Sequence, residues 1–211
     1  RIWDLQYGKI SFEKLVCDRV YRAKNKRGHR TSVSSISYHP AGRCFVLGTT
    51  CSSLQIWACT TNKGAGVVKN RPEVSVYDAH DGNATVTSVV YSPDGSKIAS
   101  RADDDTVRIW KSSIHAAATK LELMAIYRSL PGFYDSCNVA FGPLGNMLCA
   151  GTCVKPQMGA SRLKVFAANE DFLEKENKGA SKVFEPDPLI DLVVSEGASV
   201  MRVTWHKRLN Q

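Results

Sequence analysis

Residues 86–110 read VTSVVYSPDGSKIASRADDDTVRIW, and this stretch decides the fold. Apolar side chains alternate with polar ones up to Tyr91, which is typical of a strand that packs on its neighbours. Pro93 to Gly95 predicts a tight reversal, because proline fixes φ and glycine accepts a positive φ. A second strand, a polar turn at residues 103–105 and a third strand ending at Trp110 follow. The stretch therefore predicts three short antiparallel strands, with room for a fourth.

The same unit recurs along the chain. An aromatic-x-Pro-x-Gly motif begins at Tyr38, Tyr91 and Phe141, and a degenerate copy begins at Trp205. A second series of aromatic residues follows in phase, at the ends of the expected third strands: Trp3, Trp57, Trp110 and Phe166. Two series in phase indicate a repeat protein. A single small sheet cannot bury both of its faces, so successive sheets must stack around an axis, which predicts an all-β propeller.

One unit carries polar residues at four marked places: His80 before the first strand, Ser100 on the second, Asp104 in the turn and Trp110 at the end of the third. This set resembles the signature of WD repeats. The resemblance implies a buried chain of hydrogen bonds from the indole to serine, from serine to histidine and from histidine to aspartate. Such a chain would satisfy both nitrogens of a buried imidazole.

A Ser-His-Asp nucleophilic triad uses the same residue types. That chemistry needs an exposed serine and an oxyanion hole, whereas Ser100 is expected in the middle of a strand. We therefore expect a structural tetrad and no enzyme. The other units are degenerate. Cys51 replaces the turn aspartate of the first unit, and the third has Phe166 in place of tryptophan and an insertion at residues 154–161.

The repeats predict one partial propeller over residues 1–211. Three nearly complete four-stranded antiparallel blades are expected at 33–78, 85–128 and 136–194. Residues 1–22 are expected to end a preceding blade, and 199–211 to begin a following one. By analogy with the family, the full protein would have about seven blades. Unclosed blades leave bare strand edges, so we also expect copies of this piece to associate with one another.

Composition bounds the function. The chain has a net charge of +8 and a pI of about 9.2, which favours acidic partners such as nucleic acid or acidic protein surfaces. No apolar run approaches the roughly 18 residues of a membrane span, and no membrane partner is expected. The seven cysteines include no C-x-x-C motif. We expect no metal, no cofactor and reduced thiols, as in a cytosolic or nuclear protein.

The densest basic cluster precedes the first complete blade, where the strand order puts its loop on the top face of the propeller. Other loops of that face are expected to contribute to the same surface. The candidate partner-binding residues are Arg19, Arg22, Lys24, Lys26, Arg27, Arg30, Arg101, Phe133, Tyr134 and Lys155. One hypothesis is a recognition face for nucleic acid or an acidic peptide, whose binding would weaken steeply with salt. The alternative is a solvated loop that only keeps the protein soluble.

Residues 98–110 and the tail 198–206 resemble repeats of the WD repeat-containing protein 70 family, also called the gastrulation-defective type. The resemblance implies a non-enzymatic interaction scaffold that acts in chromatin or DNA-damage responses, with a nuclear location and the cytoplasm as the alternative. It also implies a candidate substrate receptor of cullin-RING ubiquitin ligases. Such receptors often carry Trp-Asp-x-Arg at the end of a third strand. Here neither Trp110-Lys111-Ser112 nor Trp3-Asp4-Leu5-Gln6 keeps that motif intact.

Overall fold

A computed structural model describes residues 2–7, 12–59, 71–113, 120–132, 134, 136–153, 159–169, 171–173 and 183–206, with the backbone alone described for 2–7 and 12–19. Within these residues the chain forms 14 strands, joined in antiparallel ladders. Three sheets have four strands each and a fourth has two. The prediction of an all-β propeller architecture is confirmed.

The strands of each large sheet are neighbours in sequence order, so every sheet is a simple meander. The two-stranded sheet pairs β1 (Ile2–Tyr7) with β2 (Phe12–Arg19). Blade 1 contains β3 (Val33–Tyr38), β4 (Cys44–Thr49), β5 (Leu54–Ala58) and β6 (Val74–Val76). Blade 2 contains β7 (Val86–Tyr91), β8 (Lys97–Ala102), β9 (Val107–Ser113) and β10 (Lys120–Tyr127). Blade 3 contains β11 (Val139–Phe141), β12 (Met147–Gly151), β13 (Ser161–Ala167) and β14 (Ile190–Ser195).

The turn after the first strand of each blade has the predicted chemistry. The glycine of each Pro-x-Gly unit has a positive φ, 78° at Gly95 in blade 2. An L-residue with a Cβ would be strained there. At Gly95 an added Cβ would also collide with the ring of His39, which lies in the equivalent turn of blade 1. The glycine therefore serves both the reversal and the close approach of two blades.

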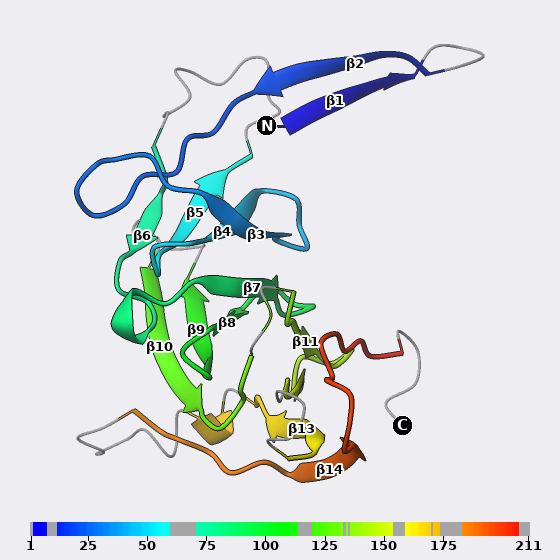
Figure 1. Ribbon diagram of the computed structural model, residues 1–211. Helices are drawn as coiled ribbons and strands as arrows, with labels where there is room; N and C mark the ends of the chain where they lie inside the picture. Colours follow the sequence, from blue (N-terminus) through cyan, green and yellow to red (C-terminus); the bar gives the residue numbers. More distant parts are fainter. Residues whose placement is uncertain are drawn as a thin grey trace.

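The blades stack face to face, as Figure 1 shows for the series from β3–β6 through β7–β10 to β11–β14. The first strands of blades 1 and 2 are joined directly. The backbone N–H groups of Val89 and Tyr91 donate to Ser35 Oγ and Ser37 Oγ at 3.0 and 3.1 Å. These serines point sideways toward the next blade instead of into their own sheet's ladder. They fix the register between neighbouring blades.

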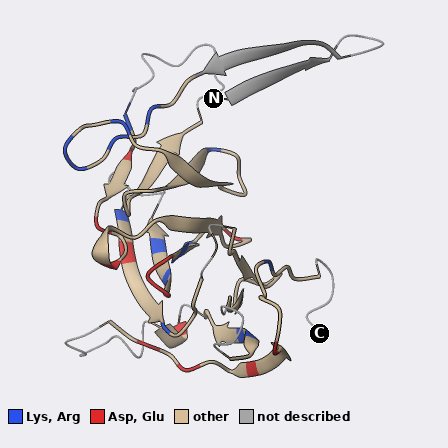
Figure 2. Cartoon of the chain, viewed as in Figure 1, with Lys and Arg blue, Asp and Glu red and all other residues tan. Residues whose placement is uncertain are grey.

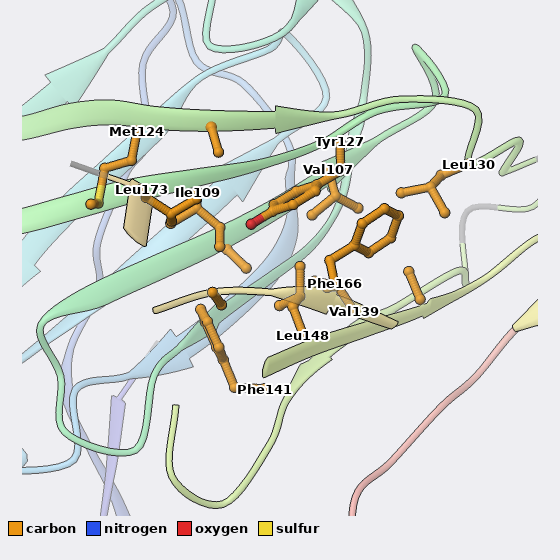
Figure 3. Packing of buried hydrophobic residues seen from close by; sticks show 14 residues of the cluster. Val107, Ile109, Met124, Tyr127, Leu130, Val139, Phe141, Leu148, Phe166 and Leu173 are labelled. Carbon is orange, nitrogen blue, oxygen red and sulfur yellow. The ribbon is translucent and has the colours of Figure 1, made fainter. Parts of the chain in front are cut away.

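Apolar cores fill the two spaces between blades. Between blades 1 and 2 the core comprises Cys44, Val46, Leu54, Ile56, Ala79, Val86, Val89, Tyr91, Ile98, Trp110 and Leu121. Between blades 2 and 3, Tyr127 and Phe166 lie at the centre of a second core, with ring centroids 4.6 Å apart (Figure 3). Burying a side chain of this size contributes roughly 1.5–3 kcal/mol. Packing between blades is therefore the main stabilising interaction.

Residues 199–206 pack on β11 in the way that β7 packs on β3. Val203 N–H donates to Asn138 Oδ1 at 2.7 Å, and Trp205 Nε1 donates to the Ala140 carbonyl at 3.2 Å. Asn138 stands three residues before Phe141, as Ser35 stands three before Tyr38. The tail was expected to begin a further blade. Residues 199–206 lie at that place but form no strand, since within the described structure their backbone makes only isolated hydrogen bonds to other backbone atoms, from Asn138 N–H to the Met201 carbonyl and from Val200 N–H to the Thr152 carbonyl. Residues 207–211 lie outside the described residues.

Two surfaces remain apolar and exposed. On β3, Val33, Ile36 and Tyr38 are 47%, 51% and 51% exposed. The outer strand β14 exposes most of its side chains, including Leu192 and Val193. Among the described residues, no helix has the length and apolar character needed to cross a membrane.

Candidate partner-binding face

The polar residues of blade 2 form one continuous hydrogen-bonded chain. Trp110 Nε1 donates to Ser100 Oγ at 2.9 Å, and the Ser100 hydroxyl donates to His80 Nε2 at 2.8 Å. His80 Nδ1 donates to the Asp104 carboxylate, 3.1 Å from both oxygens. His80, Ser100 and Trp110 are 2%, 0% and 5% exposed. A fully buried serine whose hydroxyl is already engaged offers no approach for a substrate, so the geometry is that of a structural tetrad.

Asp104 is the anchor of this chain. Burial alone would raise its pKa, but hydrogen bonds from His80, Thr106 and the Asp81 backbone outweigh burial and lower the pKa to about 2. Arg108 adds ion pairs to Asp81 at 2.9 Å and to Asp104 at 3.5 Å. Asp104 is therefore ionised at neutral pH and holds the turn, the histidine and the third strand together.

Arg101 was expected on the partner-binding face, and this prediction is wrong. Its side chain is fully buried on the face of β8 that packs against blade 3. Nη1 donates to the Asn138 carbonyl at 2.9 Å, and Nη2 donates to the carbonyls of Leu130 and Pro131 at 3.2 and 3.3 Å. Burial lowers the pKa of the guanidinium. The charge is thus used to join blade 2 to the loop that leads into blade 3.

The basic loop, residues 20–32, does reach the surface as expected. Arg22, Lys24, Lys26, Arg27 and Arg30 are all exposed. In Figure 2 this loop projects beside β6 and is coloured blue over much of its length, whereas the red segments of acidic residues lie mainly on other parts of the chain. An antiparallel backbone β-bridge between Lys24 and Arg30 and a turn at Asn25 hold the loop together. Tyr21 anchors its start, because the tyrosine ring packs in T-shaped contacts with Phe45 and Trp57. Only Lys26 has a described ion pair, to Asp78 at 2.8 Å.

The remaining candidates do not join this loop in the described structure. Tyr134 is 42% exposed in the segment that leads into β11, on blade 3. Phe133 and Lys155 lie outside the described residues, as does the side chain of Arg19. On blade 3, Arg162 pairs with Asp191 at 2.6 Å.

The sequence did not reveal the recess beside the basic loop. It has a volume of about 440 Å³ and is lined by Asn25, Lys26, Arg27, His29, Cys51, Tyr77, Asp78 and Asn83. Loops of two successive blades and the turn at Cys51 form its walls. A signal was present, because Tyr77 and Asp78 directly precede Ala79-His80, which the repeat places in a loop of the same face.

The described residues contain no group of three His, Cys, Asp or Glu side chains that could hold a metal ion. They do bring two cysteines together that sequence spacing gave no reason to pair. The Sγ atoms of Cys137 and Cys153 lie 3.1 Å apart, and both residues are buried. Burial raises the pKa of the Cys153 thiol to about 12. A thiol of this kind is protonated at neutral pH and is a poor nucleophile.

Four-stranded meanders stacked through their first strands, with a Trp-Ser-His-Asp tetrad inside one of them, define a WD-repeat β-propeller. The profile of the WD domain, G-beta repeat, matches residues 21–58 and 71–111. The chain therefore contains WD repeats at these residues, and its fold is that of a WD β-propeller.

Among curated proteins the chain is similar to Gastrulation defective protein 1 homolog of Drosophila melanogaster, with 24% identity over all of this chain and 27% of that protein. It is also similar to WD repeat-containing protein 70 of Xenopus tropicalis, with 26% identity over 91% of this chain and 26% of that protein. The predicted resemblance is confirmed. The chain spans about a quarter of the length of these relatives.

A solved structure shows the same fold. The β-propeller domain of Cps50 (Swd1) from Myceliophteria thermophila superposes with a TM-score of 0.59 at 17% identity. The superposition covers 87% of this chain and 47% of that chain.

Proposed function

We propose that this chain is a protein-interaction platform whose basic loop binds an acidic segment of a partner protein. WD40 propellers generally mediate protein–protein interactions. The observation that carries the proposal is the exposed basic loop at residues 20–32, in which Arg22, Lys24, Arg27 and Arg30 form no ion pair with any described residue. The loop borders a recess of about 440 Å³ that can take side chains of a bound segment.

Contrast with blade 2 supports this choice of surface. There the cations are used internally: Arg101 binds three backbone carbonyls, and Arg108 binds two aspartates. Unpaired exposed cations attract anionic partners and speed their association. In this chain the basic loop is where the structure leaves such cations exposed beside a concave surface.

An acidic peptide is favoured over nucleic acid because of the aromatic side chains. Binding of single-stranded nucleic acid combines cations with aromatic rings on which bases stack. Tyr21, the aromatic residue within the basic loop, is instead half-buried against Phe45 and Trp57, and its hydroxyl donates to the Ala58 carbonyl at 3.1 Å. Its ring is therefore already packed against two aromatic side chains of the protein.

Fluorescence anisotropy with a labelled oligoglutamate peptide, repeated across a salt series, tests the proposal. We expect binding by the unaltered chain that weakens steeply as salt rises, and little binding by the double variant Arg27→Glu/Arg30→Glu. The variant Arg43→Glu/Arg202→Glu makes the same charge change at exposed positions outside the loop and is the matched control. Equal affinities of both variants for the peptide would contradict the proposal. Tighter binding of a single-stranded oligonucleotide than of the peptide would indicate that the partner of the loop is a nucleic acid.

We also propose that copies of this chain associate through the exposed face of β3. Val33, Ile36 and Tyr38 occupy the positions of Val86, Val89 and Tyr91 in blade 2, where the neighbouring blade leaves them only 0%, 4% and 5% exposed. Sedimentation velocity should show association that increases with concentration and is lost in Ile36→Glu. Leu144→Glu, at a turn residue that is 70% exposed, should associate like the unaltered chain. A concentration-independent monomer would contradict the proposal.

A further inference from the structure

A second, smaller recess opens on the other side of the basic loop. It has a volume of about 130 Å³ and is lined by Arg22, Lys24, Gln55, Trp57, Arg71, Pro72 and Tyr77. Its walls come from three parts of blade 1: the basic loop, β5 and the segment that leads into β6. Tyr77 is shared with the larger recess, so the two recesses adjoin.

The charge of this smaller recess is of one sign. Arg22, Lys24 and Arg71 are exposed, and none forms an ion pair with a described residue. None of the lining residues is acidic. Three cations around so small a space repel one another unless an anion lies between them. The arrangement therefore favours an anion of more than one charge.

Two of the lining residues, Gln55 and Trp57, carry buried polar atoms that lack partners. Trp57 and Gln55 are 2% and 1% exposed, and within the described structure Trp57 Nε1 and Gln55 Oε1 form no hydrogen bond. The Gln55 amide is oriented by a bond from Nε2 to the Lys24 carbonyl at 2.6 Å. A buried donor without a partner is costly, and a ligand oxygen that reached it would remove that cost.

We propose that this recess binds a phosphate monoester carried on a serine or threonine side chain of the partner. A phosphorylated side chain carries about −1.5 to −2 charges at neutral pH, whereas a glutamate or a phosphate diester carries one. Its oxygens are strong acceptors for guanidinium groups and for the indole N–H. The inference rests on the proposed function, since it names the group that the basic loop selects within an acidic segment.

The indole N–H resonances of the ¹⁵N-labelled chain provide the test. The chain contains four tryptophans, and the variant Trp57→Phe assigns the Trp57 signal by removing it. Titration with acetyl-Gly-phosphoSer-Gly-amide should shift the Trp57 signal saturably. The Trp110 signal should stay in place, because its N–H is bonded to Ser100. Inorganic phosphate should give the same shift, and acetyl-Gly-Glu-Gly-amide should bind at least about tenfold more weakly.

Arg22→Gln/Arg71→Gln should weaken the phosphopeptide about tenfold or more, while Arg43→Gln/Arg202→Gln, with the same charge change at exposed positions outside the loop and the recess, should stay within about twofold. No saturable shift, equal affinity for the glutamate peptide, or equal loss in both variants would overturn the phosphate site. Tighter binding of a single-stranded oligonucleotide would overturn it too. If only the phosphate site fails, oligoglutamate still binds the loop in a salt-dependent way. If the proposed function fails, oligoglutamate binding is unaffected by Arg27→Glu/Arg30→Glu.

Discussion

Blades 1 and 2 are built on the same repeat, but they use their polar residues differently. Trp57 pairs with Phe45 across β4 and β5, as Trp110 pairs with Ile98 across β8 and β9. The residue two positions further on is Leu47 in blade 1 and Ser100 in blade 2. The indole N–H of Trp110 therefore donates to a serine, whereas the indole N–H of Trp57 has no described hydrogen-bond partner.

The same divergence extends to the histidine and the turn. His80 is buried between Ser100 and Asp104, whereas His29 is exposed beside a turn that carries Cys51. Blade 2 thus satisfies its polar groups internally and is a structural element. Blade 1 leaves a buried indole N–H without a described hydrogen-bond partner, and it exposes a histidine and several cations at its surface. The difference indicates that degeneration of a repeat can expose groups that a partner then binds.

Removing the two histidines should separate the blades most clearly. His80→Ala leaves Ser100 and the buried Asp104 without their shared partner, and we expect a loss of about 3 kcal/mol in the free energy of unfolding. His29→Ala changes an exposed side chain and should stay within about 0.5 kcal/mol of the unaltered chain. Urea unfolding followed by tryptophan fluorescence measures both. Similar losses in the two variants would remove the distinction between the blades.

Arg101 should behave as a structural residue. Arg101→Met leaves three backbone carbonyls without their donor, so we expect a loss of roughly 1–3 kcal/mol in stability. Arg30→Met alters an exposed cation and should leave stability nearly unchanged while weakening the oligoglutamate complex. Thermal unfolding and peptide anisotropy on both variants check this reversal. A stable Arg101→Met variant with impaired peptide binding would indicate that Arg101 belongs to the partner-binding face.

Acid should weaken blade 2 through Asp104. The pKa of this carboxyl is lowered from 3.8 to about 2 in the folded chain, so its contribution is fully present above pH 3.8 and is lost as pH falls toward 2. The contribution amounts to about 2 kcal/mol. Urea unfolding at successive pH values should show this loss in the unaltered chain and a flatter profile in Asp104→Asn. Parallel profiles would show that folding does not stabilise the ionised form of the Asp104 carboxyl.

Shortening the indoles should give the smallest difference. Trp110→Phe leaves the Ser100 hydroxyl oxygen without its donor, which costs roughly 1 kcal/mol more than loss of ring area alone. Trp57→Phe removes a donor that has no described partner, so it should be the milder change. The difference between the two free energies of unfolding is the quantity to measure. A larger loss at Trp57 would mean that its N–H is satisfied within the chain.

The fold could be predicted because its signals are local. The Pro-x-Gly turns and the in-phase aromatics each act within one blade, and Gly95 has the positive φ that its turn requires. The hydrogen bonds of the tetrad likewise join residues of a single repeat. The blade limits stay predictions, since strands alone do not define them.

The misplaced and missed residues depend on contacts between distant segments. Arg101 is buried because its guanidinium binds backbone carbonyls that lie 29–37 positions further along the chain. The periodicity of the repeat gives no sign of this contact. The smaller recess needs Arg71 to lie beside Arg22, which is far away in the sequence. Spacing in the sequence does not reveal such a meeting.

Our main claim is that blade 1 provides the binding surface and that blade 2 supports it. Amide hydrogen exchange with and without saturating oligoglutamate tests it most directly. We predict slower exchange in residues 20–32 and 71–78 on binding, with no change across residues 86–110. Protection centred on residues 86–110, or spread evenly over the chain, would contradict the claim.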